Sequence, residues 1–90
     1  MRESVKKFAE LMEKALQEND YKGGWRDCDF DYLFTRLTEE KRELRNLFHK
    51  RKFHYDLELK SEKLKEKAIR EAVDVANFCM MIADVINQRY

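Results

Sequence analysis

Apolar side chains recur at intervals of four and three residues over two long stretches of this chain, and no other feature limits its fold as strongly. The first stretch contains Leu33, Leu37, Leu44 and Leu47. This spacing places the side chains along one stripe of an α-helix, which then packs against a neighbouring element. The stripe is interrupted once, because position 40, where the series requires an apolar residue, is Glu40. A carboxylate therefore stands where the helix is expected to be buried.

The second long stretch predicts another helix, from about Leu57 to Gln88, with two apolar rows. The first row again includes one glutamate and comprises Leu64, Ala68, Glu71, Val75, Phe78, Ile82 and Val85. The second row comprises Ile69, Ala72, Ala76, Cys79, Ala83 and Ile86. A helix that is apolar on two flanks needs packing partners on two sides. Because two further helices of a 90-residue chain leave part of this surface uncovered, we expect a second subunit.

The N-terminal third of the chain predicts one further helix and a break. Residues 3 to about 18 carry a single apolar stripe and predict the first helix. The stretch 19–29, NDYKGGWRDCD, ends it, because Asn, Asp and a Gly-Gly pair favour turns. Asp29 or Asp31 is expected to cap the second helix, which runs to about Phe48.

Composition agrees with an all-α fold of about three to four helices in a single domain that covers residues 1–90. The chain has no proline, only two glycines, and 41% charged residues interleaved with apolar ones. Such a composition is typical of helical proteins. The basic stretch 49–56 is weakly patterned and is either a connection or the frayed end of the second helix. We expect its charges to be solvated rather than bound to phosphate.

Charge and hydropathy exclude several classes of function. The net charge is +1, so no overall field attracts the chain to nucleic acid or to an anionic membrane. No stretch approaches 18 unbroken apolar residues, and the N-terminus lacks the apolar core of an export signal. Two cysteines give no disulfide framework, and Cys28 and Cys79 are interpreted as reduced thiols. The expectation is a cytoplasmic protein.

The interruptions of the two apolar stripes single out a set of four acids as a candidate site. Each interrupting glutamate is followed three residues later by a second acid, Glu43 after Glu40 and Asp74 after Glu71. Residues three apart are neighbours on a helix surface. If the two helices pack through these stripes, four carboxylates converge, and their burial and mutual repulsion are relieved by bound divalent cations. Oxygen ligands favour Mg²⁺, with Mn²⁺ as the alternative.

An alternative interpretation needs no metal ion. Arg36 and Lys67 lie four residues before Glu40 and Glu71, which is the spacing of ordinary helical ion pairs. The acids would then be structural, and the chain would be a helical oligomer with buried salt bridges.

The acids also carry a family resemblance. The sequence EEKRE (39–43), followed by EAVD (71–74), resembles the EExxE…ExxD signature of the all-α nucleoside triphosphate pyrophosphohydrolases, the MazG-like superfamily. The segments KGGWRDCDFDYLFTRLTEE and REAVDVANFCMMIAD resemble a subgroup of small proteins of that superfamily, which includes phage-type dATP/dGTP diphosphohydrolases. The resemblance covers about residues 5–86.

The resemblance implies a MazG-like helical bundle completed by a homodimer or homotetramer, and a Mg²⁺-dependent enzyme. Such an enzyme cleaves a nucleoside triphosphate to the monophosphate and pyrophosphate, which clears unwanted nucleotides. The family's metal ligands correspond to Glu40, Glu43, Glu71 and Asp74. Glu39 corresponds to an outer acid or a base that activates water, so Glu39 and Glu40 are the expected catalytic residues.

A nucleoside triphosphate also requires basic side chains for its phosphates and an aromatic side chain for its base. Lys22, Arg26 and Arg36 are the candidates to hold phosphate, and Gly23-Gly24 allows backbone amides to approach it. Trp25 is a candidate to stack on a base, although a tryptophan in a loop also serves as a hydrophobic plug. Asn77 is expected to hydrogen-bond the sugar or a water, and Asp84, on the same row, is a weaker candidate for the same role.

A rival function remains compatible with the same residues. The chain would be a non-catalytic helical module that binds a nucleotide or a protein partner, and the acids would act as a sensor. This hypothesis predicts nucleotide binding without release of pyrophosphate.

Overall fold

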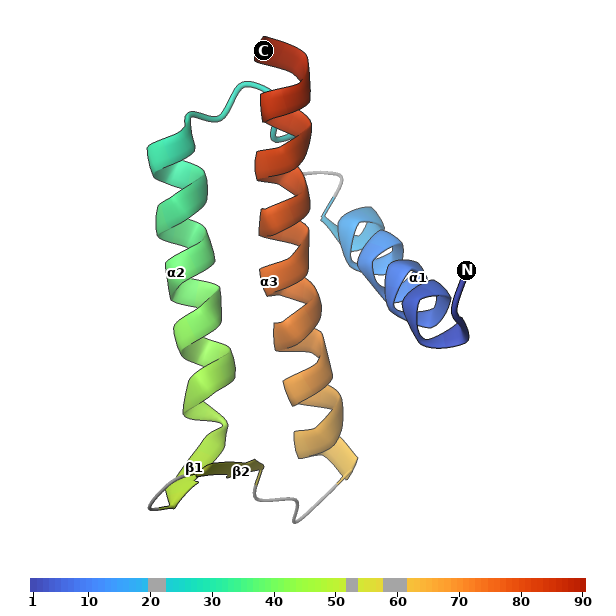
Figure 1. Cartoon of the computed structure of the whole chain (residues 1–90), viewed down its shortest axis with the longest axis vertical. Coiled ribbons are helices and arrows are strands. Elements are labelled where there is room, and N and C mark those ends of the chain that lie inside the picture. The colour runs from blue at the N-terminus through green and yellow to red at the C-terminus, as the bar shows by residue number, and fades with distance from the viewer. Residues whose placement is uncertain (20–22, 52–53, 58–61) are drawn as a thin grey trace.

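The computed structural model describes residues 1–19, 23–51, 54–57 and 62–90, and these form three helices and one short hairpin (Figure 1). In chain order the elements are α1 (Glu3–Glu18), α2 (Phe30–Asn46), β1 (Phe48–Arg51), β2 (His54–Leu57) and α3 (Glu62–Arg89). The predicted all-α fold is therefore confirmed for the body of the protein.

Local sequence explains where α2 begins. The carboxylate of Asp29, the residue before the helix, accepts a hydrogen bond from the backbone N–H of Tyr32 at 2.8 Å. This contact satisfies one of the N–H groups that the first helical turn leaves without a partner. Of the two aspartates predicted as the cap, Asp29 is the one that serves. The helix ends at Asn46, two residues before the predicted end.

The connection between α2 and α3 is a hairpin, which the sequence did not predict. Strands β1 and β2 pair antiparallel, with Phe48 opposite Leu57 and Arg51 opposite His54. Of the two alternatives predicted for residues 49–56, the connection is confirmed and the frayed helix end is wrong; α3 begins at Glu62 rather than near Leu57. Aromatic residues are frequent in this stretch, and they favour strands over helices.

Helix α3 is the central element of the fold. It lies antiparallel beside α2 and also contacts α1, whereas α1 and α2 do not pack against each other within the described residues (Figure 1). The radius of gyration is 14.8 Å, compared with about 12 Å for a compact domain of this length. The three helices therefore enclose a small core. Its buried apolar members are Ala15, Leu33, Ala68, Val73 and Val85.

The two predicted apolar rows of α3 have different environments. The row that includes Glu71 faces α2, and its members range from half-buried to fully buried. The second row is largely open, since Ile69 and Ile86 are 42% and 46% exposed. Val73 and Asn77 are also buried, which the two predicted apolar rows did not indicate, and Asn77 contacts α1. The chain alone thus leaves one flank of α3 uncovered.

No helix in the described ranges combines the length and the apolar character that crossing a membrane requires.

Replacing Leu33 by alanine is expected to lower the free energy of unfolding by about 2–4 kcal/mol, because the side chain is only 1% exposed and its loss leaves a cavity. Urea denaturation followed by circular dichroism measures the change. The matched control is Leu11→Ala on α1, where the side chain is 42% exposed and the expected loss is well below 1 kcal/mol. Equal losses for the two variants would contradict the assignment of Leu33 to the core.

Candidate functional site

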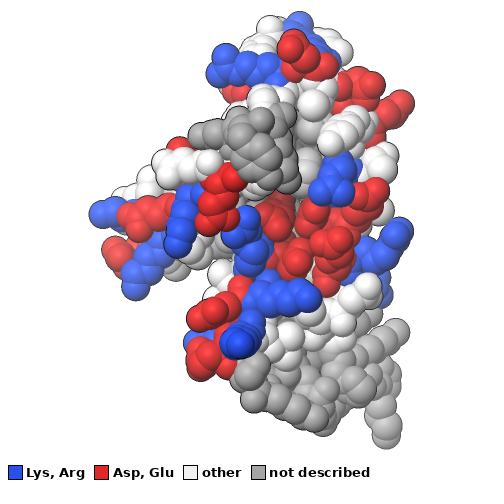
Figure 2. All heavy atoms as spheres, turned by 180° about the vertical axis from the view of Figure 1, so that it is seen from behind, with Lys and Arg blue, Asp and Glu red and all other residues white. Residues whose placement is uncertain are grey.

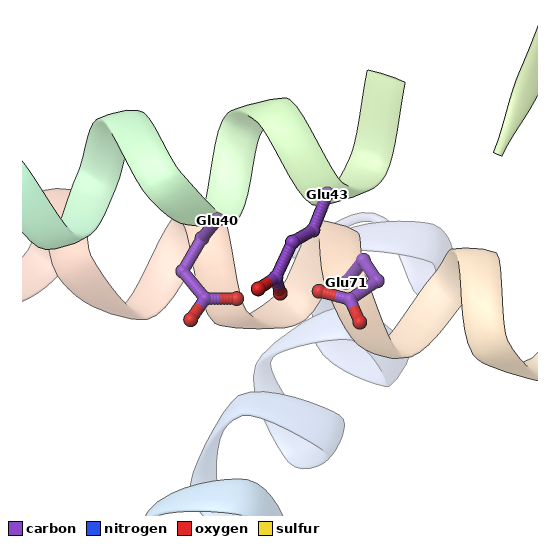
Figure 3. A group of neighbouring side chains, drawn as sticks. All are labelled: Glu40, Glu43 and Glu71. Carbon is purple, nitrogen blue, oxygen red and sulfur yellow. The ribbon is translucent and has the colours of Figure 1, made fainter. Parts of the chain in front are cut away.

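Three glutamates meet at the contact between α2 and α3. Glu40 and Glu43 extend from α2 and Glu71 from α3, with their carboxylates turned toward one another (Figure 3). One oxygen atom of each lies within 4.8 Å of those of the other two. Glu40 is buried because it occupies the apolar stripe of α2, Glu71 is half-buried, and Glu43 is exposed. We call these three residues the glutamate cluster.

One buried oxygen atom of the cluster lacks a hydrogen-bond partner in the described part of the chain. Glu71 Oε2 is buried and has no hydrogen-bond partner among the described residues. A carboxylate oxygen without a partner is costly to bury. A cation bound among the three carboxylates would supply the missing contact, and three oxygen ligands suit Mg²⁺ or Mn²⁺. The residues present therefore fit such an ion.

Proximity also changes the acidity of the carboxyl groups. Burial, reinforced by the charges of Glu43 and Asp74, raises the pKa of Glu40 to about 7, although the Arg36 guanidinium opposes the shift. Burial and the charge of Glu43 raise the pKa of Glu71 above its usual range. Burial also raises the pKa of Asp74, against the opposing effect of Arg70. In all three groups burial is the main cause of the raised pKa, and the neighbouring carboxylates add to it.

Arg36 pairs directly with one member of the cluster, Glu40. Its Nη2 donates to Glu40 Oε1 at 2.8 Å, and its Nη1 forms an ion pair with Glu39. The guanidinium also lies 5.4 Å from the ring centroid of Phe78 on α3. Of the two helical ion pairs that the alternative interpretation predicted, the Arg36–Glu40 pair is present. Between Lys67 and Glu71 no such pair is found in the part of the chain that the structure describes.

On the face seen in Figure 2, acidic side chains gather at the centre, and lysine and arginine side chains surround them. Arg70, which the sequence pattern did not single out, pairs with acids of two helices. Its Nη1 lies 2.8 Å from Glu18 Oε2 on α1, and its Nε donates to Asp74 Oδ1 at 3.3 Å. The available signal was the spacing of four residues between Arg70 and Asp74. The contact with α1 had no signal in the sequence.

A cavity of about 600 Å³ lies beside the cluster, between all three helices and the loop that precedes α2. Sites for small molecules are typically about 300–1,000 Å³. Glu40, Asp74, Arg36 and Arg70 line its charged part. Trp25 lines another part and hydrogen-bonds Asp84, which follows Asp74 by about 15 Å along the axis of α3. The cavity therefore joins a charged end to an aromatic end.

The loop at the aromatic end is held by the C-terminal part of α3. Trp25 Nε1 donates to Asp84 Oδ2 at 3.0 Å, and Arg89 Nη2 donates to the carbonyls of Arg26 and Cys28 at 3.1 and 2.9 Å. Gly23 has φ of 86°, a conformation that glycine adopts readily, so the predicted turn is present. These contacts fix the indole of Trp25 against the cavity.

The predicted site residues fall into three groups. Of the four predicted metal ligands, three form the glutamate cluster; Asp74 lies outside it, lines the cavity and accepts the hydrogen bond from Arg70. The cavity is lined by four of the six predicted substrate residues: Gly24, Trp25, Arg36 and Asn77.

The remaining predicted residues lie elsewhere. Arg26 is 70% exposed, lies 3.8 Å from Asp84, and is not part of the cavity wall. Glu39 is half-exposed beside Arg36. Lys22 is outside the described residues. Gly24 has open space where a Cβ would be, so the fold itself does not require glycine there.

Comparison with known proteins adds no family assignment, because no family model, curated protein or solved structure matches the chain. What stands is a small protein of three helices with a glutamate cluster beside a cavity.

Metal-free protein is expected to lose stability as the pH rises from about 4.5 to about 7. In this range the unfolded chain releases the Glu40 proton at its ordinary pKa of 4.5, whereas the folded protein holds it until a pKa of about 7. The folded state therefore binds more protons, and the free energy of unfolding falls by roughly 1–3 kcal/mol. Thermal denaturation in a chelator at pH 5.0, 6.0, 7.0 and 8.0 measures the trend.

Glu40→Gln should weaken this pH dependence and unfold at a higher temperature than wild type at pH 8. A residual slope should remain, because the pKa values of Glu71 and Asp74 are also raised. Glu10→Gln, at an exposed glutamate of α1, should keep the full slope of the wild type. A stability that increases from pH 5 to pH 8 in the wild type would refute the argument.

Replacing Asp84 by alanine should release Trp25 from its position, because the indole N–H loses its acceptor. Trp25 is the one tryptophan of the chain, so its fluorescence reports this site alone. The expected result is a shift of the emission maximum to longer wavelength and stronger quenching by iodide or acrylamide. Asp27→Ala, at an exposed aspartate of the same loop, should leave both unchanged. Identical spectra for wild type and Asp84→Ala would show that the hydrogen bond does not hold the ring.

Proposed function

We propose that this protein is a Mg²⁺-dependent nucleoside triphosphate pyrophosphohydrolase of the MazG-like type, which converts a (deoxy)nucleoside triphosphate and water to the monophosphate and pyrophosphate. The observation that carries the proposal is the glutamate cluster, in which acids from two helices converge beside a cavity and one buried oxygen lacks a partner among the described residues. The resemblance of EEKRE and EAVD to the family signature points to the same residues.

The proposed ligands of the ion are Glu40, Glu43, Glu71 and Asp74. Bound Mg²⁺ supplies charge neutralisation for the phosphates and lowers the pKa of a coordinated water. Glu39 is the acid proposed to remove a proton from the attacking water or to orient it, because it precedes Glu40 in the sequence and pairs with the same arginine, Arg36.

The arginines complete the charged part of the site. A triphosphate arrives with several negative charges, which carboxylates alone would repel. Arg36 and Arg70 line the same cavity as Glu40 and Asp74 and present guanidinium groups suited to phosphate oxygens. Each is paired with carboxylates in the absence of ligand, so metal binding to those carboxylates would free it to contact phosphate. Trp25, at the other end of the cavity, is proposed to stack on the base.

The assembly that we propose is a homodimer or homotetramer. The second apolar row of α3 is largely exposed, and Phe34 on α2 is 52% exposed. A second copy of the chain would cover these side chains.

Purified protein should release pyrophosphate from at least one nucleoside triphosphate in a panel of canonical and modified substrates, and only with Mg²⁺ or Mn²⁺ present. Glu71→Gln and Asp74→Asn should each reduce turnover by roughly 100-fold or more, because each removes a proposed ligand. Glu10→Gln is the matched control and should retain wild-type turnover. Full activity of both site variants would refute the assignment of the site.

Metal binding can be measured separately from turnover. Millimolar Mg²⁺ should raise the melting temperature of the wild type by mass action and should have less effect on Glu71→Gln. Stabilisation by nucleotide without pyrophosphate release would instead support the non-catalytic binding module.

A further inference from the structure

Asn77 lines the cavity although its amide side chain is almost fully buried. The residue is 4% exposed, lies on the face of α3 that contacts α1, and lines the cavity one turn beyond Asp74. Its Nδ2 donates to the backbone carbonyl of Met12 at 3.2 Å, while its Oδ1 is buried and has no partner among the described residues. A buried amide with one satisfied end and one unsatisfied end needs a further partner.

The orientation of this amide is determined by its surroundings. The carbonyl of Met12 can only accept a hydrogen bond, so the amide nitrogen must face α1. The atom left over is therefore an acceptor, and the missing partner must be a donor. Neither a phosphate oxygen nor a fully ionised carboxylate meets this requirement, whereas a hydroxyl or an amino group does.

The place of Asn77 in the cavity limits which donor it can meet. Along α3 it follows Asp74 by three residues and precedes Asp84, the acceptor of the Trp25 indole, by seven. These separations correspond to about 4.5 and 10.5 Å of helix rise. Asn77 therefore lies between the charged end and the aromatic end, nearer to the charged end. In a nucleotide the group between phosphate and base is the sugar.

We propose that Asn77 Oδ1 accepts a hydrogen bond from the 3′-hydroxyl of the nucleotide sugar and so makes Asn77 a specificity-determining residue. This inference rests on the proposed function for the identity of the ligand. The helix contact that orients the amide also sets the specificity, because α1 holds the nitrogen and leaves only the acceptor for the substrate.

The test compares a deoxynucleoside triphosphate with the corresponding 2′,3′-dideoxynucleoside triphosphate, which differs only in the 3′-hydroxyl. The base is the one that the wild type cleaves best. Wild-type protein should prefer the deoxynucleotide by roughly tenfold or more in kcat/KM, since loss of the donor leaves a buried acceptor without a partner. In Asn77→Ala the preference should fall to near one, because the acceptor itself is gone. Equal use of both nucleotides by the wild type, or an unchanged preference in Asn77→Ala, would overturn the proposal.

Two controls separate recognition from a general loss of structure. Val73→Ala removes a buried side chain one turn earlier on the same face of α3, and it should keep the wild-type preference even if it is less stable. Nucleotide binding followed by Trp25 fluorescence should give the same preference without turnover. If no nucleotide is hydrolysed but the deoxynucleotide still binds more tightly, the proposed function fails and the role of Asn77 stands.

A third nucleotide distinguishes the sugar from the base. If the substrate carries an exocyclic amino group, its preference in kcat/KM over the analogue without that group should be the same in the wild type and in Asn77→Ala. A preference for the amino group that disappears in Asn77→Ala would assign Asn77 to the base and overturn its assignment to the sugar.

Discussion

The contact between α2 and α3 buries carboxylates in an otherwise apolar interface, and the other contacts of the structure depend on this interface. Leu33 and Val85 bury their side chains there, while Glu40 is buried with them at 6% exposure. The same packing that removes apolar surface from water also desolvates acids and brings them close together, which raises the pKa of Glu40 to about 7. An interface selected only for stability would place leucine at position 40.

Both α1 and the loop before α2 depend on contacts with α3 for their positions. Arg70 connects the end of α1 to Asp74, Asn77 connects α1 through the carbonyl of Met12, and Asp84 holds Trp25. Because α1 contacts α3 and not α2 within the described residues, the three helices leave a cavity rather than a closed core. The residues of α3 that form these contacts are polar, and they line or border the space where a ligand is proposed to bind.

As a result, one apolar row of α3 is largely exposed and a glutamate is buried in the main interface of this small protein. Five buried apolar residues make a modest core in the described part of the chain, and acids within the main interface reduce its contribution further. A bound cation would relieve the repulsion among Glu40, Glu43 and Glu71, and a second copy of the chain would cover the open row of α3. On this view, ligand and partner contribute stability that the isolated chain lacks.

The sequence by itself determined that the chain forms helices and that Glu40, Glu43 and Glu71 come together, although it also placed Asp74 among them. The periodicity of apolar residues located α1 and α2, the residue type of Asp29 marked it as a cap, and the interruption of two stripes identified Glu40 and Glu71 as acids on the packing faces of their helices. All of these are local patterns, in which neighbours on a helix are three or four residues apart. Only the tertiary structure decided the hairpin, the position of Arg26 beside Asp84, and the contacts of Arg70, Asn77 and Trp25 with other segments. Those contacts join residues about 50 to 65 positions apart, and their partners include a backbone carbonyl. A one-dimensional pattern cannot specify them, because they depend on how far α1 diverges from α2 across the surface of α3.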